Sequence, residues 1–276
     1  MRIRAGYEIT YECPQPTPML LLLNVHSSRF QDLETPDVIR TDPSIPVDQY
    51  HDGFGNLCSR IVCPAGRTVL STDFVVRDSG LPDPVSPDAV QHPVEALPHE
   101  AIVFLLASRY CETEHLSDLA WKLFGDIPPG WARAQAIVEY ANQRITFGYE
   151  HARPTKTAYE AHEEGFGVCR DYAHLAITLC RCMNIPARYC TGYMGDIGVP
   201  VVGEMDFSAW FEVYLGDRWH VLDARHNRPR IGRILMARGR DATDAAIVTS
   251  FGPNTLAGFK VISDEIPDQL QRRSGE

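Results

Sequence analysis

The sequence predicts an α+β protein with two domains, and three observations lead to this fold class. From Arg2 to about Arg77, short runs rich in Val, Ile, Leu and Tyr alternate with turn signals such as "CPQPTP" and "HDGFGN", a pattern typical of antiparallel strands. Next, five prolines within Ser79–Pro98 remove backbone donors and fix φ. Beyond them, apolar residues three and four apart indicate helices that pack one face, so helices and strands are segregated along the chain.

These patterns divide the chain into four parts. We expect a small N-terminal antiparallel β domain over 1–80, a proline-rich linker over 81–98, an α+β domain over 99–262 and a polar, frayed tail over 263–276. The longest apolar stretch, Met19–Val25, is far shorter than the roughly 20 residues that cross a bilayer. We interpret it as a buried strand.

The second domain is expected to begin with helices and to end with strands. Helical spacing occurs over Glu100–Cys111, Leu116–Gly125 and Trp131–Ile145, and again over the segment that follows Cys169. Aromatic and β-branched segments come after that helix, and "LGDRW" between two of them predicts a hairpin turn.

Composition narrows the classes of partner and the compartment. The net charge of −10 repels polyanions, so a nucleic-acid partner is not expected, and neither is a membrane partner. Eight cysteines without an export signal indicate reduced thiols and a cytoplasmic protein. Cys180 and Cys182 form "CRC", which lacks the paired spacing of a zinc site. No metal or other cofactor is therefore expected.

Cys169 has the position of a nucleophile. It follows "GFG" and opens the predicted helix, where unpaired amides and the helix dipole favour a thiolate, so a lowered pKa is expected. Gly165 and Gly167 allow a substrate backbone to approach closely. A thiol nucleophile also needs a base within hydrogen-bond reach and a third group that orients the base.

At this point three ordered motifs resemble a known family. "GVCRDYAHLAITLCRCMNIPARYCTGY", "AWFEVYL" and "WHVLDARHN" look like the core of the transglutaminase-like superfamily, and the resemblance covers about Pro98 to Asn227. It implies a papain-like α+β core that follows a small β domain, as in bacterial members. Cys169 then matches the nucleophile and Asp223 matches the orienting carboxylate. Ser208 stands where the family has its histidine.

The resemblance also implies the chemistry. The Cys169 thiolate would attack a peptide or glutamine-type amide and form a thioester, with backbone N–H groups near Cys169 in the oxyanion hole. Hydrolysis by a peptidase or amidase is favoured over cross-linking by fold-level analogy. The implied partner is a peptide or protein substrate that carries an amide or a glutamine side chain. No calcium loop of suitable spacing is present.

Ser208 cannot act as a general base, because a hydroxyl does not titrate near neutral pH. One resolution is a substitute histidine. His226 lies three residues past Asp223 and is the favoured substitute; His174 points about 140° away from Cys169 on the helix, and His220 alternates away from Asp223 on the strand.

Two other resolutions stay open. The helix dipole alone could maintain enough thiolate for slow chemistry, with Ser208 and Asp223 organising a water molecule. Alternatively, catalysis has been lost, the cleft binds a peptide or glutamine-like group, and Cys169 is a relic or a redox-sensitive thiol.

A cluster of arginines near the C-terminus has two interpretations, an anionic ligand or surface ion pairs with Asp241 and Asp244. The four are Arg230, Arg233, Arg238 and Arg240.

Overall fold

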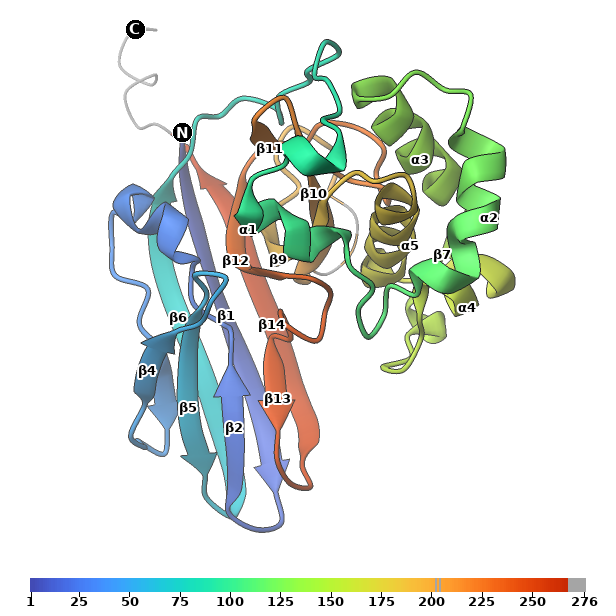
Figure 1. Cartoon of the computed structure of the whole chain (residues 1–276). Helices are drawn as coiled ribbons and strands as arrows, with labels where there is room; N and C mark the ends of the chain where they lie inside the picture. Colours follow the sequence, from blue (N-terminus) through green and yellow to red (C-terminus); the bar gives the residue numbers. More distant parts are fainter. Residues whose placement is uncertain (202, 204, 268–276) are drawn as a thin grey trace, which may run out of the picture.

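The computed structural model describes residues 1–201, 203 and 205–267. Two sheets packed face to face form a sandwich, a third four-stranded sheet lies beside it, and helices cover the far side of that third sheet (Figure 1). This arrangement confirms the α+β class.

The sandwich consists of two antiparallel four-stranded sheets. Their strand orders are β14-β1-β6-β3 and β13-β2-β5-β4. Along β6, every second residue from Thr68 to Val76 is buried, so one face of the strand meets the core as period-two alternation requires. The strands are β1 Arg2–Cys13, β2 Thr17–Leu21, β3 Arg40–Asp42, β4 Asp48–His51, β5 Leu57–Cys63, β6 Gly66–Arg77, β13 Val248–Ser250 and β14 Thr255–Ile266.

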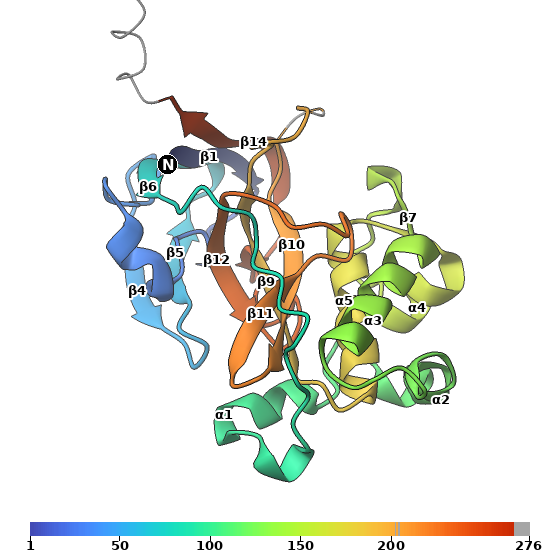
Figure 2. The ribbon, with the colours of Figure 1, turned by 90° about the horizontal axis from the view of Figure 1, so that it is seen from above.

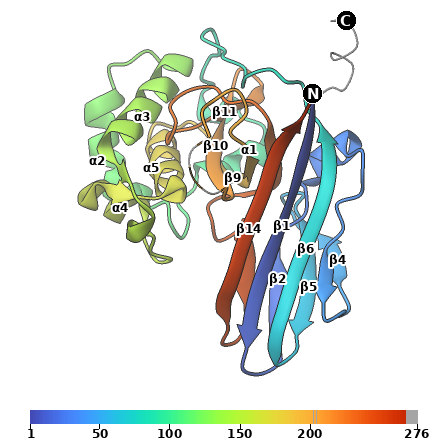
Figure 3. The ribbon, with the colours of Figure 1, turned by 180° about the vertical axis from the view of Figure 1, so that it is seen from behind.

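The C-terminal strands belong to the sandwich, which corrects the expected boundary at residue 262 and the frayed tail after it. β14 pairs with β1 from Glu12↔Thr255 to Arg2↔Ile266, and Figure 3 shows β14, β1 and β6 side by side. Only one face of β14 is buried, at Val261 and Ser263, so its polar composition reflects a solvated face. The rest of the expected tail, 268–276, lies outside the described residues.

The proline-rich segment crosses the third sheet on its way from β6 to the first helix (Figure 2). Apart from one 3-10 turn at Val94–Ala96, it has no regular element. It is held by hydrogen bonds to the second half of the chain, among them Gly216 N to Val90 O at 2.9 Å.

Five α-helices form the helical layer. They are α1 His99–Ile102, α2 Thr113–Phe124, α3 Trp131–Arg144, α4 Ala158–Glu164 and α5 Cys169–Cys182. The helix expected over 100–111 is wrong beyond residue 105, because Leu106 is extended and its carbonyl accepts a hydrogen bond from the buried Arg181 guanidinium. In the part of the chain that the structure describes, no helix is long and apolar enough to cross a membrane.

The third sheet has the order β11-β10-β9-β12 and supports the central helix α5. Its strands are β9 Ala187–Met194, β10 Ser208–Leu215, β11 Arg218–Leu222 and β12 Arg233–Gly239, and a small parallel pair joins β7 Thr146–Phe147 to β8 Phe166–Gly167. Gly216 and Asp217, both at positive φ, close the β10–β11 turn, which confirms the predicted hairpin. Every residue of α5 from Asp171 to Cys182 is buried, so the first turn of the helix is fixed against the sheet.

Candidate functional site

Cys169 is the first residue of α5, as expected. The Asp171 carboxylate accepts a hydrogen bond from Val168 N at 2.9 Å and so caps the helix start. Arg170 donates to the carbonyl of Arg153 and lies 3.4 Å from Asp171. The two residues after the cysteine therefore hold the first turn in place, while Cys169 lines an open cavity of about 420 Å³.

The thiol of Cys169 does not have the lowered pKa that its position suggested. Burial of the sulfur raises the pKa of Cys169 to about 11, although Arg225 and the backbone N–H groups of Ala209 and Arg170 act in the opposite direction. The contribution of the helix N-terminus is thus smaller than the cost of desolvating a thiolate. The resting cysteine is a thiol near neutral pH.

Ser208 opens β10 in the wall of the same cavity. Its side chain is buried, with 4% of the residue exposed, and its hydroxyl has no hydrogen-bond partner among the described residues. Its backbone carbonyl accepts from Thr191 Oγ1 at 3.0 Å. A buried hydroxyl without a partner is uncommon in folded proteins, so this atom is available to a bound molecule.

Asp223 and His226 form a pair directly after β11. His226 Nδ1 lies 3.0 Å from Asp223 Oδ2, and the backbone N–H of His226 donates to Asp223 Oδ1 at 3.0 Å. The chain curls back in a turn, with Asn227 N bonded to Asp223 O. The imidazole therefore has one nitrogen on the carboxylate, and its Nε2 has no partner within the described residues.

A buried arginine fixes Asp223 from the other side. Arg233 donates to Asp223 Oδ2 at 2.7 Å and to Asp83 of the linker at 2.9 Å. Burial by itself would raise the pKa of Asp223, but Arg233 and His226 hold that pKa well below its usual range. Asp223 is thus a permanent anion that orients the imidazole.

Two cavities meet at the start of β10. The 420 Å³ cavity contains Cys169, and a neighbouring cavity of about 330 Å³ contains His226. Asp206, Phe207 and Ser208 line both. No imidazole hydrogen-bonds the Cys169 sulfur among the described residues. The cysteine and the histidine are therefore brought to adjoining parts of one cleft, with Ser208 between them.

The structure separates the other two histidines from this cleft. His174 is fully buried, its Nε2 accepts from Ala242 N at 3.1 Å, and its ring stacks on Tyr110. His220 is buried and bonds Leu215 O at 3.0 Å. The rotational argument against His174 and the alternation argument against His220 agree with these positions.

Sequence reasoning missed two charged residues of the cleft, Asp206 and Arg225. Burial raises the pKa of Asp206, whose carboxyl interacts with Tyr149. The Arg225 guanidinium lies 3.8 Å from the centre of the Phe147 ring. Their only signal was their position, two residues before Ser208 and two residues after Asp223.

Each of the four C-terminal arginines has a partner in the protein. Arg230 pairs with Asp196, Arg233 with Asp83 and Asp223, Arg238 donates to Phe54 O, and Arg240 pairs with Asp244. These contacts favour the ion-pair interpretation over an anionic ligand.

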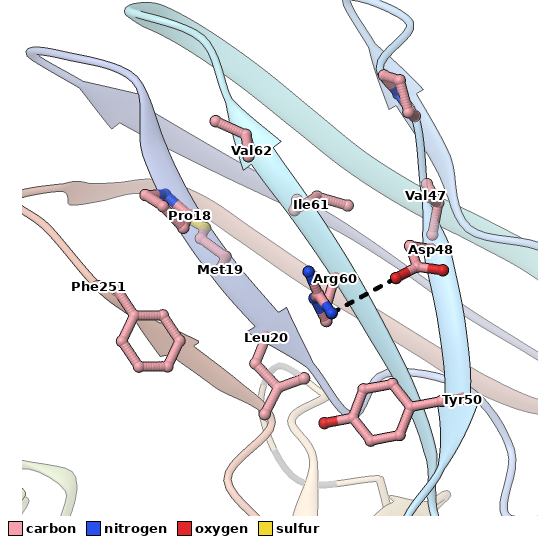
Figure 4. Close-up of a pocket in the computed structure, with 11 residues that line it drawn as sticks. Pro18, Met19, Leu20, Val47, Asp48, Tyr50, Arg60, Ile61, Val62 and Phe251 are labelled. Carbon is pink, nitrogen blue, oxygen red and sulfur yellow. Dashed lines mark ion pairs between the residues drawn. The ribbon is translucent and has the colours of Figure 1, made fainter.

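A further groove of about 600 Å³ lies on the sandwich, across β2, β4 and β5 (Figure 4). It is lined mainly by apolar side chains, and its two charged residues, Asp48 and Arg60, lie 3.6 Å apart. It contains no cysteine or histidine, so the cleft at Cys169 is the better candidate for chemistry.

Comparisons with known proteins agree with this choice. Residues 118–224 match the model of the transglutaminase-like superfamily. The chain is also similar to a crystal structure of a "putative cysteine protease" from Cytophaga hutchinsonii, with 28% identity and a TM-score of 0.84; the match covers 97% of this chain and 91% of that chain. The family resemblance and the expected papain-like core are thereby confirmed.

Two more distant similarities were found. Uncharacterized protein ML0607 of Mycobacterium leprae is 36% identical over 83 residues, which make up 29% of this chain and 30% of that protein. The periplasmic domain of TgpA from Pseudomonas aeruginosa, in a crystal structure, is 16% identical with a TM-score of 0.40, over 82% of this chain and 89% of that chain.

Proposed function

Because residues 118–224 form a transglutaminase-like core, we propose that this protein is a cysteine-type peptidase or amidase in which Cys169 attacks an amide carbonyl. One observation carries the proposal: a cysteine that opens a buried helix shares a cleft with a histidine already bonded to a buried carboxylate. These are the nucleophile, the base and the orienting group of a thiol triad, with His226 in place of a histidine at position 208.

The proposed reaction starts from the neutral thiol. His226 Nε2 accepts the Sγ proton as the sulfur bonds to the carbonyl carbon, and Asp223 stabilises the imidazolium. The C–N bond then breaks, and the imidazolium returns its proton to the leaving amine. Water, deprotonated by His226, attacks the thioester, and Cys169 leaves as the thiol. The N–H groups of Ala209 and Arg170, which point toward the sulfur, are placed to bind the developing oxyanion.

Hydrolysis is proposed over cross-linking, and a peptide or protein amide is the proposed substrate. The whole-length similarity to a protein described as a cysteine protease supports this choice. The proposed compartment is the cytoplasm, which is supported by eight cysteines that are all unpaired in the structure.

The test is to incubate the protein with a defined library of short peptides and to identify cleaved bonds by mass spectrometry. A parallel assay supplies a blocked glutamine peptide with hydroxylamine, which traps the thioester as a hydroxamate. Cys169→Ala must abolish both products, whereas His99→Ala, which alters an exposed histidine, must leave them unchanged. Cleavage without hydroxamate supports hydrolysis, and abundant hydroxamate would reverse the ranking.

A non-catalytic binding module is the second candidate, and the raised pKa of Cys169, about 11, is the observation that favours it. In that case Cys169→Ala should bind peptides from the library as tightly as the parent protein, and neither should cleave them. Ser208→His then discriminates further, because cleavage gained only in this variant would show a vacated triad.

A further inference from the structure

Arg225 is a half-buried cation without a carboxylate partner. Its guanidinium makes no ion pair and no side-chain hydrogen bond among the described residues, and it lies against the Phe147 ring. Its backbone is fixed, because Asn142 Nδ2 donates to both Ala224 O and Arg225 O, at 3.0 and 2.9 Å. The side chain is thus positioned by the fold while its hydrogen-bond donors remain unused.

Its neighbours show that this is unusual within the molecule. The other arginines around the third sheet pair with carboxylates: Arg188 with Glu212, Arg230 with Asp196, Arg233 with Asp83 and Asp223, and Arg240 with Asp244. Burying a guanidinium without a partner costs free energy. A site that retains such a group is suited to an anion that arrives from outside.

The surroundings of Arg225 indicate where that anion would lie. Arg225, Ser208 and His226 line the 330 Å³ cavity together, and Arg225 is close enough to Cys169 to lower the pKa of its thiol. Ser208 adds a buried hydroxyl that has no partner in the described structure. A planar guanidinium and a hydroxyl are suitable donors for a carboxylate.

We propose that Arg225 and Ser208 form a subsite for a carboxylate that the substrate carries next to its scissile amide. The substrate class is therefore an acidic peptide or an amide beside a free carboxyl terminus. The proposal rests on the proposed function, since it assigns the carboxylate to the substrate attacked by Cys169. Its serine is the residue that occupies the family's histidine position, so the substitution creates a binding role.

Asp206 is the group that opposes an anion here. It lines both cavities, and it interacts with Arg225 without forming an ion pair. Burial raises the pKa of its carboxyl, which reduces its charge relative to an exposed aspartate. Removing that charge with Asp206→Asn should therefore strengthen anion binding.

The experiment compares two alkylating reagents of nearly equal size, anionic iodoacetate and neutral iodoacetamide. The modification rate of Cys169 is measured for each by peptide mass spectrometry, and their ratio is divided by the same ratio for glutathione. Binding of the carboxylate beside the sulfur should raise this corrected ratio about tenfold and make the iodoacetate rate saturate. Arg225→Gln should return it to about one, Arg225→Lys should give an intermediate value, and Asp206→Asn should increase it.

Arg228→Gln is the matched control, because Arg228 lines the same cavity but is exposed. It should change the corrected ratio less than twofold, a margin set by screened surface charges. Equal losses in the two glutamine variants would replace the subsite with a diffuse positive field. A ratio of one in the parent protein would overturn the subsite, while peptide cleavage that depends on Cys169 would still uphold the proposed function. Thermal melts identify any variant that fails to fold.

Discussion

Two histidines of this protein interact with aspartates, and their surroundings differ in one respect. His174 is enclosed between α5 and the residues after β12, where burial lowers its pKa to about 3 despite Asp241. His226 lies on the loop after β11, has a side chain 18% exposed, and shares a cavity with Ser208. A nearby carboxylate is common to both, so access distinguishes them. An imidazole can exchange a proton with a substrate only where it meets a cavity.

If this comparison is correct, removing each imidazole should damage a different property. The largest expected effect is on activity: His226→Ala should lower kcat/KM for peptide cleavage about a hundred- to ten-thousand-fold, because the general base is gone. The melting temperature should stay close to that of the parent protein. Peptide cleavage and a thermal melt measure the two. Undiminished cleavage would assign the base to another group.

The carboxylate that orients His226 is expected to matter for stability as well. Asp223→Ala should lower the free energy of unfolding by about 3–5 kcal/mol, since it strands the buried Arg233 without one of its two partners. Urea unfolding measures the change. Asp83→Ala removes the more exposed partner of the same arginine and should cost less; the reverse order would contradict the geometry.

His174 should contribute to the pH dependence of stability. Its folded pKa of about 3 lies below its ordinary value of 6.5, so its contribution is complete above pH 6.5. That contribution falls by up to about 1.4 kcal/mol per pH unit as the pH drops toward 3. His174→Gln, whose side-chain oxygen can accept from Ala242 N, should flatten this slope by about one proton. Urea unfolding at several pH values provides the measurement, and an unchanged slope would show that His174 is not the titrating group.

The smallest expected effect concerns the serine between the two cavities. Ser208→Ala should raise the free energy of unfolding by about 1 kcal/mol, because it deletes a buried hydroxyl that has no partner in the described structure. Thr191→Ala, which removes a hydroxyl bonded to Ser208 O, should instead destabilise the fold. A loss of stability in both variants would indicate that Ser208 already has a partner in solution.

The sequence predicted the parts of the site that depend on local pattern. Cys169 opens a helix because "GFG" interrupts the chain before it, and the turn in "LGDRW" follows from residues that accept positive φ. Alternation on β11 also separated His220 from Asp223 correctly. These features depend on neighbours within a few residues, which a pattern records.

What the sequence did not predict depends on distant neighbours. The pKa of Cys169 is set by the packing of β10 and the loops around its sulfur, and the lone cation of Arg225 becomes apparent only after every other arginine has found its carboxylate. The expected helix over 100–111 ends early because Arg181, about 75 positions away, captures a carbonyl. Periodicity alone contains none of this information.

The pairing of β14 with β1 has a consequence for how the protein is made. The chain leaves the sandwich after β6, builds the entire catalytic half, and returns only at β13 and β14. While the ribosome is still producing the helices, β1 therefore presents an unpaired edge, the kind of surface that recruits other chains. The nascent protein has its greatest need of chaperone protection during that interval, which ends when the last strand is released.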